Sequence, residues 1–167
     1  MEYLGSEVPP VDGVIGLDVL RLKTLTIDLA RKRILFGQGR ALRFSVPLQT
    51  NESYVSVEVR THDRTLRLLL DTGVRSILLY RDRVSDRVPK LQVARMIPAN
   101  SLGGPASLDL VTLAPVQLGQ QHLDRRAVVS GKAPVGFLAG IDGCLSLNSL
   151  GARVCSINWE EGTLSWE

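Results

Sequence analysis

The chain has 167 residues, of which 44% are hydrophobic and 22% are charged, enough for one compact domain with part of a second. No stretch approaches the roughly 18 uncharged apolar residues of a membrane-spanning helix, which excludes a membrane-spanning protein. Lysines and arginines total 20 against 17 acids and are interleaved with them, so a nucleic-acid partner is not expected.

Metal sites and disulfide frameworks are not expected either. The two cysteines, Cys144 and Cys155, are predicted to be small core residues, and the two histidines, His62 and His122, lie far from any group that could share a metal with them.

Apolar residues alternate with polar ones along much of the chain, which predicts an all-β fold. Residues 54–60 alternate, residues 65–70 form an apolar run, and residues 108–118 form another that is broken by Ala114-Pro115. Only one or two short helices are expected, at Ile77–Arg83 and at Leu145–Leu150, where Gly151 would be the C-cap. Such short strands at close intervals are typical of a β-sandwich or barrel.

The end of the chain resembles its beginning at a constant offset of 130 residues. Residues 11–20 (VDGVIGLDVL) align with residues 141–150 (IDGCLSLNSL), and the match runs without a gap to Phe36 on Trp166. The repeat predicts that residues 1–37 are the tail of a preceding, truncated unit, that residues 38–49 are a linker with a first strand, and that residues 50–167 are a complete domain. Asp12 and Asp142, each before a glycine, are predicted to be N-caps of short helices.

One string in the chain has the character of a catalytic motif. An apolar strand, Leu68–Leu70, delivers Asp71 into a turn with Thr72 and Gly73. The same three residues also suit an ordinary hairpin turn, so the motif alone leaves a purely structural role open.

With this turn, residues 50–167 resemble the retropepsin-like aspartic protease family, including its bacterial members. The matching features are the turn at 71–73, a glycine-containing stretch at 101–105, a strand ending at Val116–Gly119, and a late hydrophobic-hydrophobic-Gly region. The resemblance implies a closed acid-protease-like β-barrel, Asp71 as a catalytic aspartate, Thr72 as a brace between paired active-site loops, and Gly73 as room for water and substrate. It places a substrate-binding flap at Leu102, Gly103 and Gly104.

The resemblance implies an aspartic-type endopeptidase that hydrolyses peptide bonds through a water activated by paired aspartates, with no cofactor, no metal and a polypeptide substrate. One carboxylate must act as base and a second, protonated one as acid, so one Asp-Thr-Gly is not sufficient. The second is expected from a homodimer partner or from an upstream repeat of the same protein. The compartment stays open, because a truncated chain would have lost any targeting signal, and bacterial relatives are often exported.

Three departures from the family pattern motivate an alternative, a catalytically weak or inactive module that binds peptides or dimerises. Val74 is bulkier than the usual Ala or Ser, and Arg75 would lower the pKa of Asp71 if its guanidinium pointed inward. The late glycine is present as Gly16 but replaced by Ser146 in the complete unit, which predicts a small local rearrangement there.

Overall fold

The computed structural model describes residues 15–37, 39–51, 53–61, 64–84, 92–101, 104–131, 133 and 139–167. Its elements in chain order are α1 (Leu17–Leu20), β1 (Leu25–Asp28), β2 (Arg33–Phe36), β3 (Phe44–Pro47), β4 (Gln49–Thr50), β5 (Val55–Thr61), β6 (Arg64–Leu70), β7 (Ile77–Tyr80), α2 (Arg81–Val84), β8 (Gln92–Ser101), β9 (Gly104–Thr112), β10 (Val116–Leu118), β11 (Gln121–Leu123), β12 (Arg126–Ser130), β13 (Gly143–Leu145), the 3-10 helix η1 (Leu147–Leu150), β14 (Val154–Asn158) and β15 (Thr163–Trp166). No helix in this part of the chain is long and apolar enough to cross a membrane.

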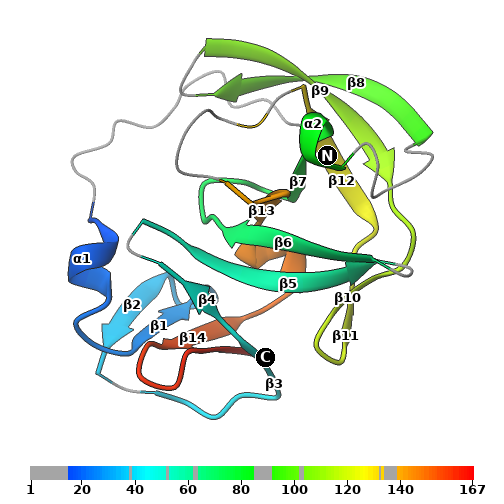
Figure 1. Ribbon diagram of the computed structural model, residues 1–167. Coiled ribbons are helices and arrows are strands. Elements are labelled where there is room, and N and C mark those ends of the chain that lie inside the picture. Colours follow the sequence, from blue (N-terminus) through cyan, green and yellow to red (C-terminus); the bar gives the residue numbers. More distant parts are fainter. Residues whose placement is uncertain are drawn as a thin grey trace.

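The strands form two sheets (Figure 1). A five-stranded sheet has the order β2-β1-β14-β15-β3, and it brings the beginning of the chain beside its end. A ten-stranded sheet has the order β11-β10-β5-β6-β13-β7-β12-β9-β8, with β4 paired to β5. The prediction of a mostly β protein with a few short helices is confirmed, whereas closure of the strands into a barrel is not found among the described residues.

The β5–β6 hairpin shows how the sequence pattern produces this layer. Val57 and Val59 are buried on one face of β5 while Glu58 and Arg60, which alternate with them, are exposed, and Leu66 and Leu68 bury the matching face of β6. Side chains of a strand alternate between the two faces, so this register is set by the apolar residues. Most of the core is one cluster that also includes Leu145, Leu164 and Trp166 from the end of the chain.

The helix predictions are confirmed in part. Leu147–Leu150 is a 3-10 helix, and Gly151 ends it with φ 62°, as a C-cap glycine should. The prediction over Ile77–Arg83 is wrong for its first half, because Ile77–Tyr80 is strand β7 and only Arg81–Val84 is helical. β7 pairs in parallel with β12 and antiparallel with β13, and these distant partners override the local helical pattern.

Candidate active site

Asp71 directly follows β6 and begins the turn that leads to β7. Its backbone N–H donates a hydrogen bond of 3.1 Å to the carbonyl of Leu145, the last residue of β13. The side chain of Asp71 is half-buried, whereas Thr72 and Gly73 are exposed. The turn therefore presents a carboxylate whose backbone is tied to a fully buried strand.

A hydrogen bond inside the turn also fixes the Asp71 carboxylate. The backbone N–H of Gly73 donates to Oδ1 of Asp71 at 2.8 Å. A Cβ atom on residue 73 would lie 3.1 Å from the same oxygen, closer than a comfortable contact. Glycine at this position thus leaves room for the carboxylate itself, a tighter role than the predicted room for water and substrate.

β13 is threaded between β6 and β7, the two strands that the Asp71 turn connects. Gly143, Cys144 and Leu145 pair in parallel with Leu68 to Leu70, and Gly143 and Cys144 pair with β7 on the other side. A Cβ atom on Gly143 would lie 2.0 Å from the carbonyl oxygen of Leu78. Gly143 is therefore the residue that permits the close crossing behind the turn, and its only sequence signal was the match of Gly143 to Gly13.

Ser146, where the family pattern has glycine, has a clear structural role. It is buried and is the N-cap of η1, and its hydroxyl accepts a hydrogen bond of 3.2 Å from the backbone N–H of Asn148. Since the close approach is made at Gly143, a side chain at residue 146 is accommodated at the start of the helix.

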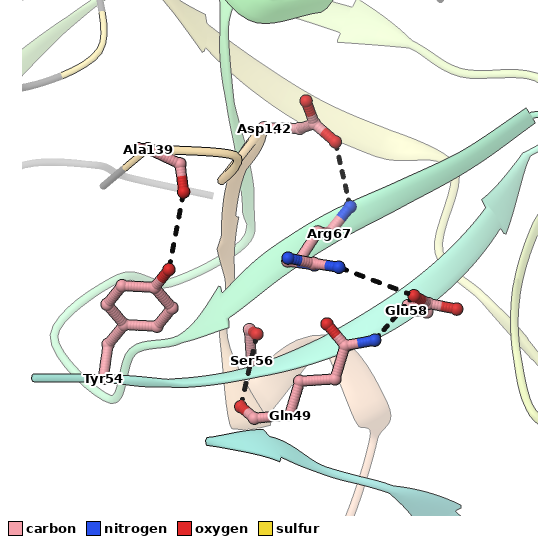
Figure 2. Close-up of polar contacts among 7 residues, drawn as sticks. All are labelled: Gln49, Tyr54, Ser56, Glu58, Arg67, Ala139 and Asp142. Atoms are coloured by element: carbon pink, nitrogen blue, oxygen red, sulfur yellow. Dashed lines mark hydrogen bonds and ion pairs between the residues drawn. The ribbon is translucent and has the colours of Figure 1, made fainter. Parts of the chain in front are cut away.

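Asp142 is not the N-cap of this helix, so that prediction is wrong for Asp142, whereas Asp12 lies outside the described residues. Its carboxylate Oδ2 accepts a hydrogen bond of 2.9 Å from the backbone N–H of Arg67, in the middle of β6 (Figure 2). Its own N–H donates to the Arg67 carbonyl at 2.9 Å, and its carbonyl accepts from Tyr80 N–H at 3.0 Å. Asp142 therefore fixes the segment before β13 to both strands that flank it.

A small buried cluster of Tyr80, Ile141 and Cys144 lies behind the turn, and Val74 packs against it. The Tyr80 hydroxyl and Cys144 Sγ are within hydrogen-bond distance at 3.3 Å. Burial raises the pKa of both groups, and the Asp71 carboxylate nearby raises each pKa further, so both stay protonated near neutral pH. Sequence reasoning missed Tyr80, which carried no motif, while the branched side chain of Val74 is explained by this packing.

Arg75 is exposed and lines a hollow of about 470 Å³ beside the turn. The hollow is also lined by Arg95, His122 and Arg126, but Asp71, Thr72 and Gly73 are not among its lining residues. The hollow therefore does not include the Asp71 turn. Among the described residues, no group of three His, Cys, Asp or Glu side chains could hold a metal ion.

The predicted flap corresponds to the hairpin of β8 and β9. Gly104 is the first residue of β9 and pairs with Ser101, the last residue of β8, while Leu102 and Gly103 lie outside the described residues. In Figure 1 the closed end of this long hairpin lies on the same side of the molecule as the turn between β6 and β7.

Comparisons with known proteins agree with this architecture. The family model described as "Aspartyl protease" matches residues 56–154, more than half of the chain. A crystal structure of a retropepsin-like aspartic protease from Rickettsia conorii superposes with a TM-score of 0.50 at 13% sequence identity, covering 76% of this chain and 94% of that one. No curated protein matches the sequence. The chain belongs to the aspartyl protease family, and its fold is retropepsin-like.

Proposed function

We propose that this protein is an aspartic-type endopeptidase and that Asp71 is one of its two catalytic aspartates. The observation that carries the proposal is the anchoring of Asp71, whose N–H is bonded to buried β13 and whose Oδ1 is held by Gly73 N–H. A half-buried carboxylate fixed in this way is preorganised to bind and activate a water molecule.

Peptide hydrolysis by this route needs two carboxyl groups about 3 Å apart that share one proton. The ionised carboxylate takes a proton from the water as it attacks the peptide carbonyl, and the protonated one donates to that carbonyl. The second aspartate comes from another Asp-Thr-Gly lobe, in a partner chain or in the same polypeptide. The exposed position of Thr72 suits a brace that contacts the second turn.

The substrate would be an extended polypeptide that lies between the Asp71 turn and the β8–β9 hairpin. Such a segment is held by main-chain hydrogen bonds, as an added strand is. The pairing of Gly104 with Ser101 at the junction of β8 and β9 supports this assignment, and Leu102 and Gly103 complete the proposed flap in the sequence.

The alternative function is a module that keeps the groove but does not hydrolyse peptides. This alternative is less well supported, because two of the three unusual residues have structural explanations that leave Asp71 in place. Val74 packs on the Tyr80 cluster, and Ser146 caps η1. Arg75 is exposed.

The test is cleavage of an unstructured protein between pH 3 and 7 by a protein in which a second Asp-Thr-Gly lobe is present, compared as the wild type, Asp71→Asn and a control, Glu160→Gln. Glu160 is an exposed acid in the β14–β15 turn. We expect the control to match the wild type and Asp71→Asn to lose at least about 100-fold in rate, since the catalytic base is removed. Equal rates in the wild type and Asp71→Asn would refute the proposal, and peptide binding without cleavage in either would favour the alternative.

A further inference from the structure

The five-stranded sheet has two similar halves. The first is α1, β1 and β2, and the second is η1, β14 and β15, whose bounds lie 130 residues further on to within one residue. β1 pairs antiparallel with β14 so that Thr26 faces Ser156, its own equivalent, and their hydroxyl oxygens are 3.1 Å apart. On either side Leu25 faces Ile157 and Ile27 faces Cys155, which is the reciprocal pattern of a two-fold axis.

The two halves differ in what covers them. Three apolar residues in or just before the second half are buried, whereas their equivalents in or just before the first half are open to solvent. The pairs are Ile15 (62% exposed) and Leu145 (0%), Ile34 (54%) and Leu164 (0%), and Phe36 (48%) and Trp166 (1%). With Val19 and Leu22, which are also exposed, Ile15, Ile34 and Phe36 make an apolar face that we name the α1–β2 face.

The second half shows what such a face packs against. Leu145, Leu164 and Trp166 are part of the main core with residues of β5, β6 and β7. The outer edge of β15 pairs with β3, and Phe44 of β3 stacks on Trp166 with ring centroids 5.6 Å apart. β2, the equivalent of β15, ends the order of its sheet, and no strand of the described residues takes the place beside it that β3 takes beside β15.

We propose that the α1–β2 face is the seat of a second β-domain with the architecture of residues 44–144, joined ahead of this face in a longer form of the polypeptide. This domain would place one strand beside β2 and bury the α1–β2 face in its own core. The additional statement that it supplies the second catalytic aspartate rests on the proposed function.

A second copy of this chain is a poorer occupant. The surface that would have to cover Ile34 and Phe36 is already filled in every copy by its own Leu164 and Trp166. A copy could offer that surface only by opening its core, which costs several buried apolar side chains. The fitting occupant is therefore a domain that has no closing unit of its own, and residues 15–37 are that closing unit.

The test compares the 167-residue chain with an extended chain in which a copy of residues 37–144 is joined in front of residue 15. Hydrogen exchange of the β2 amides, Arg33–Phe36, reports whether a strand pairs there, and a hydrophobic dye reports whether the face is open. We expect exchange of the outward-facing β2 amides to slow by at least about tenfold in the extended chain and dye fluorescence to fall. A matched control, Ile34→Asp with Phe36→Asp in the extended chain, should restore fast exchange.

The outcomes separate this inference from the proposed function. Protected β2 amides without peptide cleavage would support the inferred position of the second domain and refute the proposed peptidase activity. Unchanged exchange and dye binding in a folded extended chain would overturn the inference, and so would a stoichiometric dimer of the 167-residue chain whose β2 amides are already protected.

If the extended chain does not fold, the 167-residue chain can still test whether the α1–β2 face is open. Ile34→Ser with Phe36→Ser should then leave its midpoint of thermal unfolding nearly unchanged, whereas Leu164→Ser should lower it strongly. A loss for the double variant as large as for Leu164→Ser would show that the face is already covered, against the inference.

Discussion

Replacing Gly143 with alanine tests the packing that positions Asp71. The added Cβ would lie 2.0 Å from the Leu78 carbonyl oxygen and 3.0 Å from both the Leu78 carbonyl carbon and Leu79 Cα. Ordinary contacts begin at 3.4 Å, so β13 and β7 must move apart by about 1.4 Å at this point. The neighbouring atoms belong to backbone, which cannot rotate away as a side chain can.

The cost has two parts of similar size. Overpacking in a dense core costs about 1 to 3 kcal/mol, and weakening the two residue pairs that join β13 to β7 costs about 1 to 3 kcal/mol more. We therefore expect Gly143→Ala to lower the free energy of unfolding by about 3 kcal/mol or more and the unfolding midpoint by about 6 to 12 °C. Cleavage should fall by roughly 100-fold in protein that is still folded, because Leu145 on the same strand binds the backbone of Asp71.

Urea denaturation measures the first effect, and cleavage below the unfolding transition measures the second. The control is Gly131→Ala, since a Cβ at residue 131 meets nothing within 4 Å and should change stability by less than about 0.5 kcal/mol. A Gly143→Ala protein within about 1 kcal/mol of the wild type would refute the reasoning, because the crossing behind the turn would then tolerate a side chain.

Three further substitutions or modifications test separate parts of the site. Gly73→Ala should displace the Asp71 carboxylate, because the new Cβ would lie 3.1 Å from its Oδ1. The cleavage rate should fall with little change in the unfolding midpoint, and a fall in both would contradict this local effect. Ser146→Ala should lower the free energy of unfolding by about 1 kcal/mol through loss of the η1 cap, and Ser146→Gly by only a few tenths, both measured in urea. Burial raises the pKa of the Cys155 thiol to about 12, so the thiolate is scarce at pH 8, and iodoacetamide should label this residue only after unfolding; rapid labelling of native protein would contradict the burial.

Local sequence pattern was sufficient for the strands that bury one face. β5 and β6 lie within a residue or two of the predicted runs because their apolar residues alternate and are adjacent in the chain. β7 was assigned as helix because its ladder is made with β12 and β13, which lie far along the chain. Periodicity carries no information about such partners, so the segment between residues 77 and 83 could not be divided correctly from sequence alone.

The candidate site also combines features that local sequence predicts with contacts that depend on distant residues. The Asp-Thr-Gly string marked Asp71 because three adjacent residues carry the signal. Gly143 and Asp142 act on Leu78 and Arg67, which are more than 60 residues away, and the local Asp-Gly pair suggested only a helix cap. Those contacts needed the three-dimensional arrangement of β6, β13 and β7.

The two-fold relation between the halves of the five-stranded sheet extends to the residue that anchors the Asp71 turn. In the complete unit the Leu145 carbonyl accepts the Asp71 N–H, and Leu145 is the residue that precedes Ser146 and η1. Ile15 stands at the equivalent place before Gly16 and α1. If a second β-domain occupies the α1–β2 face, we expect the Ile15 carbonyl to anchor the second aspartate as Leu145 anchors Asp71. The exposed first half would then support the second active-site loop, since Ile15 has the position that Leu145 has in the complete unit.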